Sequence, residues 1–160
     1  MKRFFPLLLL LSLLVSCKNG ELFNEQHTIK NSVWNRFEAE TFEFESTNSD
    51  DFYNLYLYAE IDTTQYLART LPLNINLYSS NGERRMFTAT ITLRDSHGAS
   101  KGTLLDNGNI FAEQCARKMF CFNSVGHYTL ELGQATHYYD IRGIKKIGVR
   151  IKNAPLEYPE

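Results

Sequence analysis

The feature that most constrains the fold of this chain is a strict alternation of apolar and polar residues. In LPLNINLY, residues 71–78, the odd-numbered positions are all Leu or Ile. Side chains point alternately to the two faces of a β-strand, so a period of two places the apolar side chains on one face. The pattern returns in residues 41–45, 53–61, 86–93, 127–132 and 144–151. Each stretch predicts a half-buried strand.

The segments between these stretches predict turns rather than helices. Asn-Gly pairs at 81–82 and 107–108 are typical of tight turns. No segment carries a sustained helical stripe, and residues 114–118 and 134–138 predict at most a turn of helix. About eight strands at short spacing favour an all-β fold, an antiparallel β-sandwich. We expect jelly-roll-like strand order first and immunoglobulin-like order second.

Residues 1–16 have the composition of a secretory leader. Lys2 and Arg3 precede an apolar run over residues 4–15. This run is shorter than the roughly 20 apolar residues that a membrane-spanning helix needs. It fits the apolar region of a signal peptide, which is removed from the mature protein.

The leader ends in Leu14-Val15-Ser16-Cys17, which resembles the lipobox of bacterial lipoproteins. In that motif the Cys thiol receives a diacylglycerol, and cleavage then leaves the Cys as the new N-terminus. The small Ser16 gives the peptidase access to the bond. Cys17 is therefore predicted to be the lipidated residue, and two or more acyl chains anchor a protein stably.

These features divide the chain into four parts. Residues 1–16 are the expected lipoprotein signal peptide, 17–36 the lipidated N-terminus and tether, 37–154 the β-sandwich domain and 155–160 a C-terminal tail. The formal charge of the whole chain is −1, and it becomes more negative when Lys2 and Arg3 leave with the leader. This charge argues against a broad nucleic-acid-binding surface.

Two further cysteines, Cys115 and Cys121, form a candidate disulfide in an exported protein. Six residues along one strand separate Cα atoms by about 20 Å. A disulfide needs roughly 4.4–6.8 Å, so the pair can join only if the chain reverses between them, for example at residues 116–118. Two buried free thiols are the alternative.

The sequence contains no convincing catalytic or metal-binding group of residues. Asp95, Ser96 and His97 are adjacent in a predicted turn, where they cannot take the geometry of a catalytic triad. His127 and His137 have no third ligand at metal spacing, and residues 48–51 lack the regular acidic spacing of a calcium loop. We expect no enzyme activity, no metal and no cofactor.

Aromatic residues suggest a second kind of site. The chain has nine Tyr and eleven Phe, and some of them fall on predicted outward faces or loops. Tyr56, Tyr58, Tyr78 and Tyr139 are the candidates for an aromatic contact surface. Such a surface could bind a glycan or a protein. Alternatively, a return segment covers these side chains, because strands favour aromatics whatever their role.

The order and spacing of several motifs resemble a known family. They are LFNE (22–25), Trp34, FEF (42–44), YNLYL (53–57), LPLNINLYSSNG (71–82), TLRDSHG (92–98), Gly102, F-x3-GHYTLELGQA (122–135) and RGIKKIGVRI (142–151). This series is similar to the gliding-motility-associated lipoproteins of the GldH type, from Bacteroidetes. The likeness covers nearly all of the chain after Cys17. It departs from the family's pattern at ASKGTLLD (99–106) and at Thr136-His137.

The resemblance implies an outer-membrane lipoprotein that acts as an accessory to gliding motility and its secretion machinery. It implies protein partners in an envelope complex and supplies no enzyme activity or small-molecule substrate. Lys18 follows the lipidated cysteine, where Asp favours inner-membrane retention in other Gram-negative groups, and so favours the outer membrane. We prefer the periplasmic face to the cell surface. A surface glycan-binding lipoprotein is the alternative.

Overall fold

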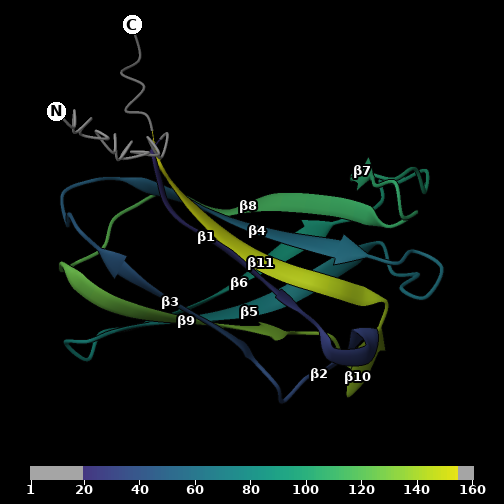
Figure 1. The fold of residues 1–160 in the computed structure, drawn as a ribbon, viewed down its shortest axis with the longest axis horizontal. Coiled ribbons are helices and arrows are strands. Elements are labelled where there is room, and N and C mark those ends of the chain that lie inside the picture. Colours follow the sequence, from purple (N-terminus) through teal and green to yellow (C-terminus); the bar gives the residue numbers. More distant parts are fainter. Residues whose placement is uncertain (1–19, 155–160) are drawn as a thin grey trace, which may run out of the picture.

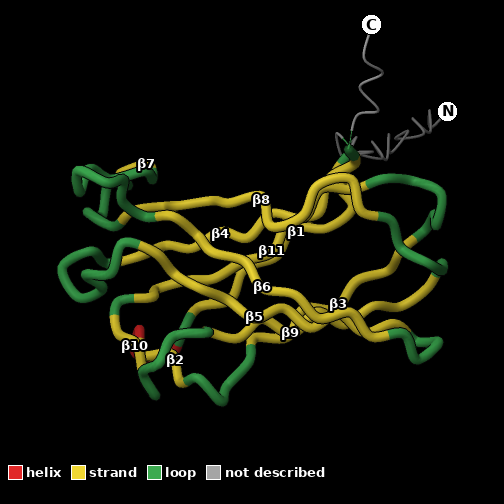
Figure 2. Tube along the Cα trace, turned by 180° about the vertical axis from the view of Figure 1, so that it is seen from behind, coloured by secondary structure: helices red, strands yellow, loops and turns green. Residues whose placement is uncertain are grey.

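The structure is a computed structural model that describes residues 20–154. The expected signal peptide, the lipidation site Cys17 and the tail 155–160 lie outside the described residues. Two antiparallel sheets face each other as the layers of a sandwich (Figures 1 and 2). Within residues 20–154, no helix has the length and apolar character needed to cross a membrane.

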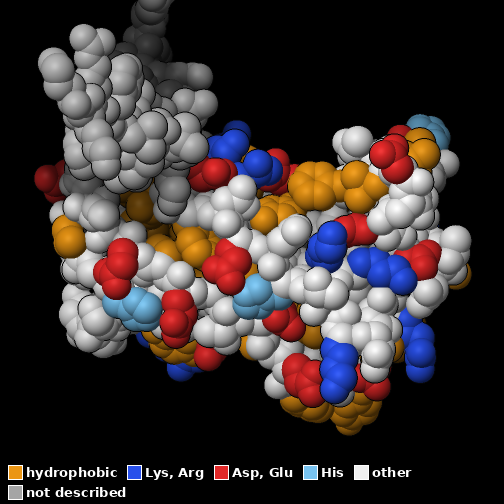
Figure 3. Space-filling model, viewed as in Figure 1, with side chains coloured by type: hydrophobic (Ala, Val, Ile, Leu, Met, Phe, Trp, Pro, Cys, Tyr) orange, Lys and Arg blue, Asp and Glu red, His pale blue; other side chains and the backbone are white. Residues whose placement is uncertain are grey.

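The first sheet has five strands in the order β1-β11-β4-β8-β7. Their bounds are β1 (Glu21–Thr28), β4 (Tyr53–Ile61), β7 (Thr103–Leu104), β8 (Ile110–Phe120) and β11 (Ile144–Asn153). Figure 3, seen from the side of the sandwich where β1 and β11 lie in front, shows charges of both signs interspersed over that side of the molecule. This mixture is the usual pattern of a solvated face.

The second sheet has four strands in the order β3-β9-β5-β6. They are β3 (Glu40–Ser46), β5 (Thr70–Ser79), β6 (Arg84–Thr92) and β9 (Gly126–Gln134). A separate pair, β2 (Val33–Asn35) with β10 (Asp140–Arg142), closes one end of the sandwich beside the short helix η1 (Lys30–Ser32).

The connectivity is that of a jelly roll. Without the short β2, β7 and β10, eight long strands remain, and their chain order gives sheets 1-8-3-6 and 2-7-4-5. This is the order of two interlocked Greek keys. The prediction of an all-β antiparallel sandwich is confirmed, with jelly-roll rather than immunoglobulin-like order.

The core lies between the sheets, where the alternating sequence places it. In β5, Leu71, Leu73 and Ile75 are fully buried, whereas Asn74 is exposed. The single Trp, Trp34, is also buried, and its Nε1 donates to the Glu38 carbonyl at 2.8 Å. This bond satisfies the one polar atom of a side chain that contributes a large apolar area to the core.

The expected tether over residues 17–36 is wrong from Glu21 onward. Residues 21–28 form β1, which pairs with β11, and Val33–Asn35 forms β2. The domain therefore begins at Glu21 and not at residue 37. An edge strand needs only one paired side, so the polar sequence ELFNEQHT forms a strand without a clear period of two.

The expected helical turn at residues 114–118 is also wrong, because these residues lie in the middle of β8. Their Glu, Gln, Ala and Lys neighbours favour helix, but pairing with β4 overrides that preference. Two register shifts, at Tyr53/Leu55 and Leu55/Tyr56, interrupt this pairing. The irregular register hides the period of two in the sequence. Residues 135–139, after β9, form no helix either.

Both ends of the described chain meet at one end of the first sheet (Figure 1). The Asn153 amide donates to the Gly20 carbonyl at 2.7 Å. Asn153 pairs with Tyr53, and Tyr53 pairs with Phe120. Neighbouring strands are about 4.8 Å apart, so the start of β1 and the end of β8 are separated by about 15 Å along this end.

Candidate functional site

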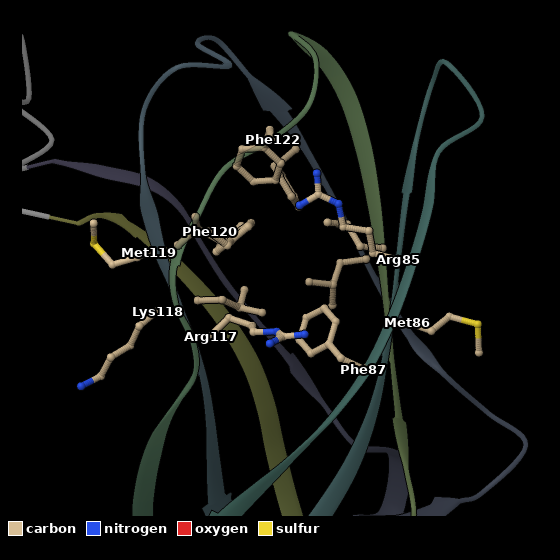
Figure 4. A pocket seen from close by; sticks show the side chains of 13 residues that line it. Arg85, Met86, Phe87, Arg117, Lys118, Met119, Phe120 and Phe122 are labelled. Carbon is tan, nitrogen blue, oxygen red and sulfur yellow. The ribbon is translucent and has the colours of Figure 1, made fainter.

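A cavity of about 430 Å³ opens at one side of the sandwich, between the edges formed by β6 and β8 (Figure 4). We call this side the open edge. Its lining comes from both sheets and comprises Phe44, Leu55, Leu77, Arg85, Met86, Phe87, Arg117, Lys118, Met119, Phe120, Phe122, Leu130 and Ile151. The volume lies within the range of about 300–1,000 Å³ that is typical of small-molecule sites.

The floor of the cavity belongs to the hydrophobic core. Leu55, Leu130 and Ile151 line it and are almost fully buried. Phe122 lies at its upper wall and packs on Phe120, with ring centroids 5.0 Å apart. The cavity is thus an apolar space that reaches inward between the two sheets.

The mouth of the cavity carries cationic side chains. Figure 4 shows the Arg117 guanidinium in the opening, and its Cζ lies 5.0 Å from the centroid of the Phe87 ring. Among residues 20–154 Arg117 makes no side-chain hydrogen bond and no ion pair. Its neighbour Lys118 points away from the opening. Arg117 therefore has free donors at the rim of an apolar space.

Arg85, on β6, is the second guanidinium of the mouth and is held in place. Its Nε donates to Glu83 at 2.7 Å, and its Nη1 donates to the Cys121 carbonyl at 2.7 Å. Asn123 also donates to Glu83. Glu83 is the only carboxylate in the two segments that form the mouth, residues 83–87 and 115–122, and it is already paired.

The opposite side of the sandwich, where β1 faces β3, is filled. We call it the closed edge. The Phe23 ring lies 5.2 Å from Phe44 and 6.4 Å from Phe42. The His27 ring stacks on Phe42 at 4.3 Å, and its Nδ1 lies 2.8 Å from Glu40 on the other sheet. Apolar packing and a polar bridge therefore join the two sheets here.

The environment of His27 raises its pKa above the ordinary 6.5. Partial burial opposes this change and is the largest single influence. Hydrogen bonds with Glu25 and Glu40, together with the charges of both carboxylates, outweigh it. The protonated ring is thus the form that bridges the two sheets.

Glu60 is a buried carboxylate with a structural role. Burial acts to raise its pKa, but hydrogen bonds from Asn109, Lys146 and Asn107 outweigh burial and lower the pKa to about 2. Lys146 lies 2.9 Å away, and the two asparagine amides donate at 2.7 and 2.8 Å. These bonds of Glu60 hold the turn before β8 against strands β4 and β11.

The four tyrosines proposed as an aromatic surface do not lie together. Tyr56 and Tyr58 belong to β4, Tyr78 to β5 in the other sheet, and Tyr139 to the segment before β10, where it is 68% exposed. Tyr78 donates to Glu131 at 3.0 Å on the outer face of its sheet. The glycan-binding alternative therefore has no shared platform in this fold.

Tyr58 is outward-facing but covered. Its ring lies across Gly148 on the neighbouring strand, where an added Cβ would come within 2.3 Å of the ring. Its hydroxyl donates to the Asn24 side chain at 2.8 Å on β1. The ring thus joins three strands, which requires a glycine at position 148.

The remaining residues considered as disulfide, catalytic or metal-binding candidates form no such site among residues 20–154. Cys115, in β8, and Cys121, just after it, are free thiols in the structure, and burial raises the pKa of Cys115. Asp95 Oδ1 accepts from the amides of His97 and Ala99, which is the bonding of a turn residue. Among residues 20–154 no three His, Cys, Asp or Glu side chains are placed to hold a metal ion.

The cavity was not foreseen from the sequence. Its lining is scattered from Phe44 to Ile151, so only the strand order brings it together. One signal was available: Arg85 shares the inward face of its strand with Phe87, Ala89 and Ile91. A guanidinium on an apolar face indicates either a buried ion pair or an opening.

The strand order defines a jelly-roll domain, and its open edge carries a cavity that reaches between the two sheets. The chain belongs to the GldH lipoprotein family, whose model matches residues 21–151. The match begins with β1 and ends within β11, and it confirms the family resemblance seen in the motifs. No curated protein matches the sequence. The family is one of lipoproteins associated with gliding motility and is not a known enzyme family.

Proposed function

We propose that the chain is a non-catalytic accessory component of the gliding machinery and its secretion system, anchored by a lipid on Cys17 at the periplasmic face of the outer membrane. The family match carries this proposal, because it covers the whole described domain and names a lipoprotein. The lipobox supplies the attachment atom, and Lys18 favours the outer membrane over the inner one.

The early start of β1 supports a domain held close to the lipid. Three peptide units separate Cys17 from Gly20, and they can span at most about 11 Å. Gly20 is already bonded to Asn153. An anchor at Cys17 would therefore keep the end of the sandwich that contains Gly20, Tyr53 and Phe120 near the bilayer surface.

The anchor is tested by replacing Cys17→Ala in the full chain, expressed in a strain that lacks the native copy. We expect loss of labelling by an alkyne fatty acid, loss of the protein from the outer-membrane fraction, and impaired colony spreading. Cys121→Ala is the matched control, because it removes a thiol of the folded domain and leaves the lipobox intact. Both variants are compared at equal protein abundance.

The accessory role is tested separately from the anchor. Chemical cross-linking of the wild-type protein in intact cells should capture components of the gliding or secretion apparatus, and Cys17→Ala should capture fewer. Normal spreading and normal secretion in a strain without the protein would refute the accessory role. Full labelling of Cys17→Ala would refute the lipid site.

A further inference from the structure

We propose that the open-edge cavity binds one aliphatic chain bearing an anionic headgroup, with the chain between the sheets and the headgroup at Arg117. Neither the family match nor a role in motility assigns a ligand to this cavity, so the inference goes beyond the proposed function.

The inner part of the cavity fits an aliphatic chain. Its walls are the apolar side chains of Phe44, Leu55, Leu77, Leu130 and Ile151, all buried in the core. The side chains that form these walls carry no polar atom. Burying an aliphatic chain against these walls removes apolar surface from water, which favours binding.

The rim fits an anion. Arg117 and Arg85 stand on opposite sides of the opening, on β8 and β6 (Figure 4). Glu83, the carboxylate of the two segments that form the mouth, is bound to Arg85 and Asn123. A carboxylate or phosphate at the rim would therefore meet the free donors of Arg117 and would not displace an existing ion pair. Guanidinium groups bind such anions in a bidentate manner.

The position of the cavity fits a ligand drawn from the lipid phase. Phe120, a lining residue, pairs with Tyr53 at the end of the sheet where Gly20 lies. Gly20 and Phe120 are separated by about three interstrand spacings, or about 15 Å. Exposed Met119 is itself a lining residue of the cavity. Exposed Phe52 lies at the same end of the sheet, where its carbonyl accepts from the Ala154 amide.

Photo-crosslinking tests the proposal on the full lipidated chain in isolated membranes. The probe is a long-chain fatty acid that carries a diazirine in its tail. We expect labelled peptides that contain the lining residues Leu55, Leu77 and Leu130, located by mass spectrometry. A phospholipid with the same diazirine tail is used in parallel: labelling by the acid alone assigns a free fatty acid, and labelling by both assigns membrane lipid as a second source.

Two adjacent side chains provide a matched pair of variants. Arg117→Gln should reduce labelling of the lining by about tenfold, the loss expected for one charge-assisted hydrogen bond. Lys118→Gln removes the same charge from a side chain that points away, and it should leave labelling unchanged. Arg117→Lys keeps the charge but loses the bidentate pair of donors, so its labelling should lie between that of the wild type and that of Arg117→Gln. Urea midpoints confirm that the variants are folded.

Three results would overturn the proposal. They are labelling spread over the surface and absent from the lining, equal labelling by the matching long-chain alcohol, and equal effects of Arg117→Gln and Lys118→Gln. None depends on spreading or secretion, so the result is independent of the proposed motility role.

Discussion

The two sides of the sandwich contain similar aromatic residues, but one side is filled and the other holds a cavity. At the closed edge, Phe23 fills the space between β1 and β3, and His27 binds Glu40 across it. At the open edge, Phe87 and Phe120 line a cavity, and a guanidinium stands on each side. The two edges differ in how completely apolar side chains fill the gap and in charge pairing across it.

The comparison indicates which interactions hold the two sheets together at the side of a sandwich. Apolar side chains attract each other without direction, but a polar bridge fixes the distance between the sheets. The closed edge has a base on one sheet and an acid on the other. The open edge has a guanidinium on both sides and no acid–base pair across the gap; Arg85 is paired with Glu83, just before the same strand, and Arg117 keeps free donors for an anion.

The largest expected effect on stability comes from removing an aromatic side chain that fills the closed edge. Phe42→Ala should reduce the free energy of unfolding by about 3–5 kcal/mol, because Phe42 is fully buried and a cavity would replace its ring. Phe87→Ala at the open edge should cost only about 1 kcal/mol, because Phe87 is half-buried and already borders a cavity. Urea unfolding measures both, and equal losses would contradict the contrast between the edges.

The polar bridge of the closed edge should respond to pH. The folded protein raises the pKa of His27, so it binds the proton more tightly than the unfolded chain does. The resulting stabilisation is complete below the unfolded pKa and is lost as pH rises through the higher folded pKa. Hydrogen exchange of β1 amides, corrected for the intrinsic pH dependence of exchange, should show protection that weakens as pH rises above the ordinary His pKa of 6.5.

His27→Gln should abolish this pH response. His127→Gln is the control, because His127 is exposed on β9 and lies outside the closed edge. The residues that line the open-edge cavity include no His, so amides of β6 and β8 serve as an internal reference. A pH response of the same size in those strands would contradict the assignment to His27.

The smallest expected effect on stability comes from reversing one charge of the open edge. Arg117→Glu loses a cation–π contact and gains a carboxylate in an opening that also holds Arg85, so stability should change by less than about 0.5 kcal/mol. Selectivity should reverse, with a long-chain diazirine amine labelling the cavity in place of the acid. Lys118→Glu should produce no such reversal, and a reversal there would count against a headgroup site at Arg117.

The sequence predicted strands best where one face of the strand is buried in the core and the other is not. Residues 53–61 were predicted as a strand with the observed bounds, and β5 differs by one residue at each end. The polar edge strand β1 was taken for a tether, because one exposed side and one paired side leave little apolar alternation. β8 was missed because the irregular register with β4 disrupts the period of two.

The candidate site was less accessible to sequence reasoning than the fold. The proposed lipidation site at Cys17 rests on a contiguous motif, whereas the cavity needs Phe44, Leu77 and Arg117 to be brought together by strand order. Strand order depends on which pairs of strands bury their faces best, and that information is spread over the whole chain. The outward tyrosines were identified only from the alternation of side chains along a strand. This alternation does not indicate that a neighbouring strand covers Tyr58.

The pairing of β1 with β11 has a mechanical consequence for a protein fixed by its N-terminus. A pull on the domain directed away from the bilayer would be transmitted along β1, from Gly20 towards Thr28. Antiparallel hydrogen bonds lie perpendicular to the strands, so this force loads the whole ladder in shear. A tether at the C-terminal end of β11, pulled against β1, would instead open the same bonds one after another. The proposed N-terminal attachment would therefore place the load in the direction in which the edge strand is hardest to remove.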